Sequence, residues 1–220
     1  MSSRRSTGKG GRGRRPKKQK DASLASLAMQ GVSRIMKLIN IEEKYLVSAS
    51  AGSATTFNGV LQDLCSPSQG ASVNQRIGDS IKLQRITFRG SFYLGAVACT
   101  VRAMLVVDKG NQAAAGSDIL AGAGNAYAPQ STIVDQLEER YHILGDTGHH
   151  TLTLNGDQSH DWEWKVGNEV LSRLNAEGHI LFSPASTTIT TNSLKLLLIS
   201  SVSASTPTCY YYSKVEYTDD

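Results

Sequence analysis

The chain has 220 residues, with 23 lysines and arginines against 19 aspartates and glutamates, and 40% of its residues are hydrophobic. This length suits one sizeable domain or two small ones, and the composition excludes a wholly disordered protein. No apolar run approaches the roughly 20 residues of a membrane helix, and the first twenty positions hold no Leu, Ile, Val or Phe for a secretory signal. The three cysteines are odd in number and widely spaced, which argues against a disulfide framework and a paired-cysteine zinc site.

The positive charge is concentrated at the N-terminus. The first twenty residues contain no acidic residue and nine basic ones: Arg4, Arg5, Lys9, Arg12, Arg14, Arg15, Lys17, Lys18 and Lys20. The rest of the chain carries the other 14 basic and all 19 acidic side chains, a net charge of −5. Like charges repel one another, and this segment has too little apolar surface to fold alone. The sequence therefore predicts a disordered basic arm, residues 1–20, on a mildly acidic body.

Such an arm is suited to neutralising phosphates. Flexible lysines and arginines hold the nucleic-acid backbone without reading base sequence, and nine contacts to a single strand give a log–log salt slope of about −6. Residues 14–20 are also typical of a nuclear import signal. Attraction to a membrane surface is the competing interpretation, but no apolar anchor accompanies the charge.

Residues 21–40 have a helical pattern. Asp21 is suited to an N-cap, and apolar side chains then recur at steps of three and four: Leu24, Leu27, Ala28, Val32, Ile35 and Leu38. Arg34 and Lys37 lie in the last turns, where cations complement the helix dipole and extend the basic surface of the arm. A helix this short is marginal in water. We therefore expect its apolar stripe to pack on its own domain or against copies of itself in neighbouring subunits.

From Ile41 onward the hydrophobic period is two, which is typical of β-strands. Residues 161–166 alternate strictly between polar and apolar side chains. Residues 209–217 place successive side chains on opposite faces, and in 151–155 Leu152 and Leu154 share a face.

Three further segments complete this pattern. Residues 101–107 are apolar on both faces apart from Arg102, as in an interior strand, and residues 81–94 need a bulge near Gln84–Arg85 to keep their alternation in phase. Residues 111–130 are rich in alanine and glycine and are expected to form a loop. We predict seven to nine strands in an all-β sandwich over residues 41–220.

Two patterns could suggest catalysis or metal binding. Asp146 begins an Asp-Thr-Gly tripeptide, as in aspartic proteases, where two such loops share a proton, but it occurs once and a turn between strands is the simpler interpretation. Four histidines lie within nineteen residues: His142, His149, His150 and His160. Neighbouring strand residues point to opposite faces, and no ligand-type spacing is present. We therefore expect neither an enzyme nor a metal site.

Four stretches, with the arm and the helix, carry a resemblance to a known family. Residues 75–90 (QRIGDSIKLQRITFRG) lead into an early strand, and residues 101–109 (VRAMLVVDK) form a strand and turn. Residues 139–146 (ERYHILGD) combine arginine with an aromatic residue, and residues 210–219 (YYYSKVEYTD) form a closing strand. In order and spacing they resemble coat proteins of the satellite tobacco necrosis virus type, which includes many circular single-stranded DNA viruses. Lys214 stands where an arginine is common in that type.

The resemblance implies an eight-stranded jelly roll that self-assembles into the smallest icosahedral shell (T=1) of about sixty copies. The arms would turn inward onto a single-stranded genome, and arm helices of three subunits would bundle beneath the three-fold axis. Some relatives bind calcium between subunits, but no residue here maps onto those ligands, so no metal or cofactor site is assigned. The expected partners are copies of the chain and single-stranded nucleic acid, in the virion and, during assembly, in the host nucleus.

Two other functions stay open. A β-sandwich nucleic-acid-binding module that forms no shell would sediment as a monomer or small oligomer. A dimeric aspartic protease would lose all activity in the Asp146→Asn variant. Between the two genome types, the import-like run and the closing strand favour DNA over RNA.

Overall fold

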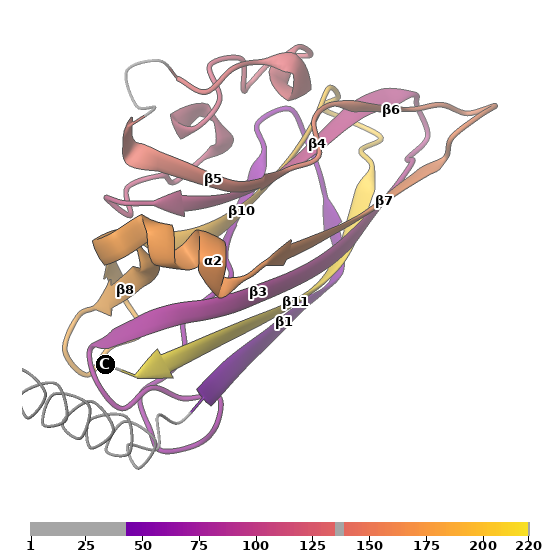
Figure 1. Ribbon diagram of the computed structural model, residues 1–220. Helices are drawn as coiled ribbons and strands as arrows, with labels where there is room; N and C mark the ends of the chain where they lie inside the picture. Colours follow the sequence, from indigo (N-terminus) through magenta and orange to yellow (C-terminus); the bar gives the residue numbers. More distant parts are fainter. Residues whose placement is uncertain (1–42, 135–138, 220) are drawn as a thin grey trace, which may run out of the picture. The chain divides into compact units, whose positions relative to one another are not determined.

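Two antiparallel β-sheets face each other as a sandwich in the computed structural model of the protein (Figure 1). The structure describes residues 43–134 and 139–219, which belong to one compact unit, Glu42–Asp220. The predicted arm and the predicted helix over 21–40 lie outside the described residues. Within the described ranges, no helix is long and apolar enough to cross a membrane. The prediction of an all-β sandwich is confirmed.

The described residues form eleven strands: β1 (Glu43–Ala54), β2 (Val60–Asp63), β3 (Ser80–Tyr93), β4 (Cys99–Asp108), β5 (Tyr141–Asp146), β6 (His150–Leu152), β7 (Ser159–Val166), β8 (His179–Phe182), β9 (Ile189–Thr191), β10 (Ser193–Ser200) and β11 (Thr208–Asp219). Short helical segments occupy the connections: η1 (Gly116–Asp118), η2 (Ala128–Gln130), α2 (Asn168–Leu171) and η4 (Ser172–Gly178).

The strand order is that of a double-sheet jelly roll. One sheet runs β1-β11-β3-β8-β9, with β7 also pairing with β3, and the other runs β2-β10-β4-β5, with β6 also pairing with β4. The chain passes repeatedly between the sheets, so β1, β3 and β11 lie in one layer while β2, β4 and β10 lie in the other. The structure has eleven strands rather than eight because two of the eight positions are interrupted and β9 adds one more strand beside β8. A turn at Gly148, with φ +63°, separates β5 from β6, and α2 separates β7 from the β8–β9 hairpin.

The main core lies between the sheets, and β3 shows how the sequence builds it. Ile81 and Leu83 are buried before an irregularity, and Ile86, Phe88 and Phe92 are buried after it. The pairing of β3 with β11 slips at the same place, so that a bulge at position 84 restores the phase of the buried side chains. The bulge that the sequence predicts is confirmed.

Two tryptophans lie directly over glycines at one side of the sandwich. Trp162 and Trp164 lie on β7 and pack against the main core. A Cβ atom on Gly90 of β3 would lie 2.3 Å from the Trp162 ring, and one on Gly145 of β5 would lie 2.7 Å from the Trp164 ring. Only glycine lets an indole lie directly on the backbone at these positions.

A second core cluster covers the outer face of the five-stranded sheet. Met104, Val106, Leu197 and Ile199 point away from the main core and are fully buried. Their cover comes from the β4–β5 connection, which contributes the buried residues Ala113, Ile119, Leu120 and Ala128. Figure 1 shows this connection beyond β5, on the far side from β3 and β11. The segment predicted as a plain loop is therefore a packed layer with two helical turns.

Two details of the strand prediction need correction or completion. Leu152 is buried at the end of β6, but Leu154 is 53% exposed, so the strand predicted over 151–155 ends early. The N–H of Thr153 instead donates to the carbonyl of Asp157 in the following turn. The cysteines Cys65, Cys99 and Cys209 are buried as separate thiols, and burial raises the pKa of Cys65 to about 12.

Candidate nucleic-acid interface

The eleven basic residues that the sequence assigns to nucleic-acid binding lie outside the described residues: Arg4, Arg5, Lys9, Arg12, Arg14, Arg15, Lys17, Lys18, Lys20, Arg34 and Lys37. Their role stays a prediction. The structure shows instead how the basic side chains of the folded domain are engaged.

Most of those side chains are already paired with carboxylates. Nine of them form ion pairs with N–O distances of 2.5–3.6 Å: Lys44, Arg76, Arg85, Arg89, Arg102, Arg140, Lys165, Lys195 and Lys214. A phosphate would have to displace a carboxylate at each of these positions. The first twenty residues of the chain have no carboxylate side chain at all. The two regions therefore differ in composition, because the segment 1–20 contains no acidic partner for its own cations.

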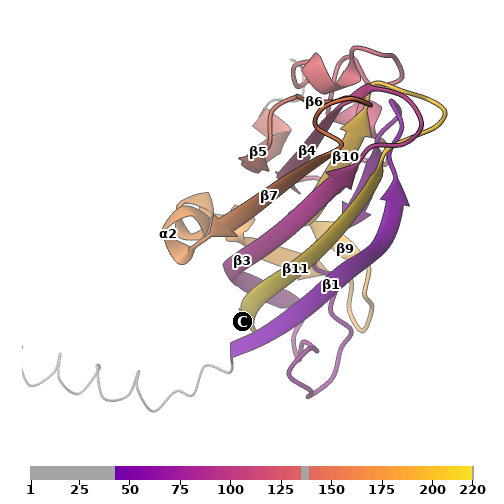
Figure 2. The ribbon, with the colours of Figure 1, turned by 90° about the vertical axis from the view of Figure 1, so that its right-hand side faces the viewer.

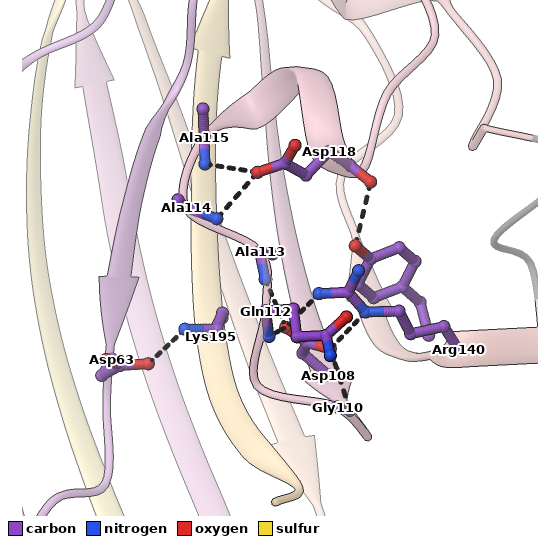
Figure 3. A network of polar contacts seen from close by, with 11 residues as sticks. Asp63, Asp108, Gly110, Gln112, Ala113, Ala114, Ala115, Asp118, Arg140 and Lys195 are labelled. Carbon is purple, nitrogen blue, oxygen red and sulfur yellow. Dashed lines mark hydrogen bonds and ion pairs between the residues drawn. The ribbon is translucent and has the colours of Figure 1, made fainter. Parts of the chain in front are cut away.

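A buried pair, Asp108 and Arg140, illustrates the structural use of charge in the domain (Figure 3). The Arg140 guanidinium donates to both carboxylate oxygens of Asp108, from Nε at 2.8 Å and from a terminal nitrogen at 3.0 Å. The backbone N–H groups of Gly110, Gln112 and Ala113 donate to the same carboxylate at 3.2, 2.9 and 2.8 Å. Burial alone would raise the pKa of Asp108, but the hydrogen bonds from Arg140 and Ala113 outweigh it and the pKa is lowered.

This network fastens the β4–β5 connection to the five-stranded sheet. Asp108 ends β4 and Arg140 directly precedes β5, so their pair holds the two ends of the connection together. Asp118 accepts from the N–H groups of Ala114 and Ala115, and the Tyr141 hydroxyl donates to the Asp118 carbonyl at 2.9 Å. The Asp108 carboxylate accepts five hydrogen bonds from within the domain, so the network is a structural clamp.

The outer face of the six-stranded sheet carries exposed aromatic side chains. We call it the tyrosine face, after Tyr45, Tyr93, Tyr210 and Tyr212, which are 39–48% exposed. The rings of Tyr93 and Tyr210 meet edge to face at 5.6 Å, and the Lys214 ammonium lies 4.9 Å from the centre of the Tyr45 ring. Exposed aromatics interleaved with cations are typical of platforms that stack single-stranded bases. The alternation in residues 209–217 signals half of this face, whereas Tyr45 and Tyr93 become part of it only through strand pairing.

The cations of the tyrosine face share two carboxylates. Arg89 Nε donates to the Glu163 carboxylate at 2.9 Å, and the Lys165 ammonium lies 3.2 Å from the same carboxylate. Glu216 pairs in the same way with Lys214 at 2.5 Å and with Arg85 at 3.6 Å. A shallow groove between β11 and β7 is lined by both kinds of charge. The face therefore offers rings for stacking, but each of its four named cations already has a carboxylate partner.

The residues considered for catalysis serve structural roles. Arg102 donates to both oxygens of Asp146, at 3.0 and 2.6 Å, and the Gly148 N–H donates to it at 2.8 Å. Burial raises the pKa of Asp146, but the hydrogen bond from Arg102 outweighs it and the pKa is lowered. A carboxylate held ionised by a bidentate arginine is not arranged to share a proton with a second aspartate.

The histidines do not converge on an ion. Among the described residues, no group of three or more histidine, cysteine or acidic side chains is placed to hold a metal. His150 and His160 stack face to face, with ring centroids 3.9 Å apart and an interplanar angle of 17°. This stack joins β6 of one sheet to β7 of the other. Its geometry is that of packed rings rather than of ligands around a common centre.

Comparison with known proteins gives structural similarity alone. No protein family and no curated protein match the sequence. The structure of Desmodium yellow mottle tymovirus is 15% identical over 80% of this chain and 86% of that chain, with a TM-score of 0.36. Two structures of infectious bursal disease virus, of the Gx strain and of a VP2 subviral particle, are each 11% identical over 80% of this chain, with TM-scores of 0.31 and 0.30. The chain spans 32% and 33% of those two chains.

The class of protein is defined by its own strand order. The described domain is a double-sheet jelly roll with one outer face covered by its β4–β5 connection and the other outer face exposed.

Proposed function

We propose that the chain is a viral capsid protein that self-assembles into a small icosahedral shell and packages single-stranded nucleic acid through its basic arm. The shell would hold about sixty copies, the number in the simplest closed icosahedral arrangement. Residues 14–20 would direct the protein to the host nucleus for assembly, and the genome would be DNA. The mature protein would reside in the virion.

The observation that carries this proposal is the separation of charge along the chain. The first twenty residues hold nine basic side chains and no acidic one, whereas nine basic side chains of the folded domain are paired with carboxylates of the same domain. Counterion release makes the unopposed cations the main source of affinity for phosphates. A body with net negative charge does not compete with the arms for nucleic acid.

The magnitude of the arm charge suits packaging. Nine charges in each of about sixty copies amount to about 540 positive charges inside one shell. Such a total neutralises a substantial part of a small single-stranded genome, and mobile cations would cover the remainder. A jelly-roll domain supplies the wall, because its two sheets form a flat, rigid block whose edges and loops contact neighbouring blocks.

Electron microscopy of the purified protein, with absorbance at 260 and 280 nm on the same fraction, tests the proposal. Uniform spherical particles with a high 260/280 ratio are expected, and nuclease typing of their contents then distinguishes DNA from RNA. A small species without particles, in the presence of nucleic acid at low salt, would overturn the capsid function and leave the binding module.

Charge-neutral arm variants separate packaging from assembly. A variant with all nine arm residues changed to glutamine keeps the length of the arm and is the matched control for deletion of residues 1–20. Both variants should retain the sandwich by circular dichroism and lose nucleic acid from their particles. In the wild type, the salt dependence of single-strand binding should have a log–log slope of about −6. A slope near zero, or full packaging by the glutamine variant, would contradict the role of the arm.

A further inference from the structure

The edge strand β1 presents a row of backbone groups to solvent. Among the residues that the structure describes, β11 is the strand that pairs with β1, and it does so on one side only. Figure 2 shows β1 as the outermost strand of its layer, beside β11. An exposed strand edge is a template for pairing with another strand.

One hydrogen bond fixes which amides face outward. The N–H of Tyr45 donates to the carbonyl of Val73 at 3.0 Å, in the loop outside the sheet, so it points away from β11. Alternate residues of a strand point their backbone groups to the same side. Val47 and Ala49 therefore direct their N–H and C=O groups outward, while Leu46 and Ser48 direct theirs to β11.

This edge lacks the usual protection against strand pairing. Natural edges carry charged side chains, prolines or bulges that block a second strand. From Leu46 to Ala54 there is no charged residue and no proline. The strand is bounded instead at its two ends, by the Val73 contact at Tyr45 and by an irregularity at Gly52, where φ is +126°. The open stretch is short and is centred on Ser48.

We propose that this stretch pairs with the same stretch of a second copy, antiparallel about a two-fold axis at Ser48. This inference rests on the proposed function, since it names one contact between subunits of the shell. Two-fold pairing about Ser48 sets Val47 opposite Ala49 of the second copy and Ala49 opposite its Val47, with four backbone hydrogen bonds in all. The larger side chain of each pair meets the smaller one.

The other side chains fit the same axis. Ser48 meets its own symmetry copy in a pair without direct backbone hydrogen bonds, where Cα atoms lie about 4.5 Å apart and serine hydroxyls can bond. The acidic Glu43 and the basic Lys44 lie outside the paired stretch, so no like charges are opposed. Because Gly52 turns the chain aside, the second copy does not have to pass through the Val73 loop.

A disulfide across the axis tests the pairing directly. Ser48→Cys should give a chain dimer on non-reducing gels after mild oxidation of assembled particles, because a pair of this type has the spacing of a disulfide. Ser50→Cys is the matched control: it lies two residues away on the same strand, opposite Leu46, and should stay monomeric. The native cysteines are buried and do not compete.

A charge exchange tests the register without a cross-link. Val47→Lys together with Ala49→Lys opposes two ammonium groups in both outer pairs, and particle yield should fall about tenfold. Val47→Lys together with Ala49→Glu opposes unlike charges in the same two pairs and should restore the yield. Both variants should keep the far-ultraviolet circular dichroism of the wild type.

The outcomes separate this inference from the proposed function. A Ser48→Cys dimer and recovery by the lysine–glutamate variant support the pairing. Normal particles from every variant, without a cross-link, overturn the pairing and leave the capsid function standing. Absence of particles from the wild type overturns the capsid function, and the Ser48→Cys cross-link in solution then decides the strand pairing on its own.

Discussion

The two sheets of the sandwich differ in what happens to their outer faces. In the five-stranded sheet, β10 is buried at every position from Ser193 to Ser200, and β4 is buried along most of its length. In the six-stranded sheet, β7 and β11 alternate between buried and exposed side chains, and the tyrosine face remains open. A strand reads as continuously apolar when both of its faces are covered and as alternating when one is open. The sequence of each strand thus reports whether a further layer lies outside it.

The difference arises from one connection. The described residues of the β4–β5 connection fold back over the five-stranded sheet, whereas the other connections that the structure describes leave the outer face of the six-stranded sheet exposed. The Asp108–Arg140 pair closes the base of that connection. The contrast between a covered and an open face therefore depends on a small number of buried contacts.

The largest expected effect comes from breaking the clamp. Arg140→Leu leaves the fully buried Asp108 carboxylate without its guanidinium, and the loss of one partner of a buried pair costs about 3–5 kcal/mol of unfolding free energy. Urea denaturation at pH 7 measures it. The control is Arg89→Leu, which removes an exposed pair with Glu163 and should have a far smaller effect. Equal effects of the two variants would contradict the structural role assigned to the clamp.

The second-largest expected effect tests the packing of the β4–β5 connection on the five-stranded sheet. Leu197→Ala empties space between β10 and the β4–β5 connection, and truncation of a fully buried leucine costs about 2–5 kcal/mol. Tyr212→Ala removes a larger side chain from the tyrosine face. Because Tyr212 is 46% exposed, this variant should change the urea midpoint only slightly. If Tyr212→Ala were as destabilising as Leu197→Ala, the outer face of the six-stranded sheet would be covered in the folded protein.

The third effect is a dependence on pH at the junction of the two sheets. Burial and the neighbouring His150 lower the pKa of His160 below its usual value near 6.5, and the carboxylate of Asp161 opposes this only in part. The unfolded chain then binds more protons than the folded one as pH falls through this region. The stabilisation from the neutral stack is present above the usual pKa and is lost on acidification.

Thermal unfolding at pH 7.5 and pH 5.0 measures this dependence. The wild type should lose more stability on acidification than His160→Gln, which cannot gain the proton. His149→Gln is the control, since His149 is exposed next to the stack and should leave the pH dependence unchanged. Identical pH dependence in the wild type and His160→Gln would show that other groups govern acid stability.

The sequence predicts strands better than it predicts their partners. Alternation over 161–166 and 209–217, the apolar run 101–107 and the bulge at Gln84 follow from side-chain periodicity, which is local. The packing of residues 111–130 over the five-stranded sheet does not follow from periodicity. Its small residues carry little periodicity and are buried through contacts with Leu197 and Ile199. Strand limits set by turn geometry, such as the early end of β6, depend on hydrogen bonds that form only after the hairpin closes.

For the candidate nucleic-acid interface, too, the local features can be predicted from the sequence and the long-range contacts cannot. The basic arm is visible in the sequence because charge density is a local property, and its assignment does not need a fold. The ion pairs of Arg85 with Glu216 and of Arg89 with Glu163 are not visible in the sequence, because they form through pairing across strands. Counting basic residues along the chain would overestimate how much of the domain attracts phosphates.

The smallest expected effect on stability concerns the pairing of Arg89 and Lys165 with Glu163. Glu163→Gln frees Arg89 and Lys165 on the exposed sheet surface, and we expect no measurable change in melting temperature because exposed ion pairs contribute little. The same change removes the carboxylate partner of Lys165 and of Arg89, which lines the groove together with Tyr212. In protein lacking residues 1–20, single-stranded DNA should therefore bind measurably tighter to Glu163→Gln than to the parent at low salt, and the gain should vanish at high salt.

Asp157→Asn, which removes an equal charge from an exposed turn away from those cations, should give a smaller gain. Equal gains would mean that net charge alone governs binding, and that the local pairing on the tyrosine face has no part in it.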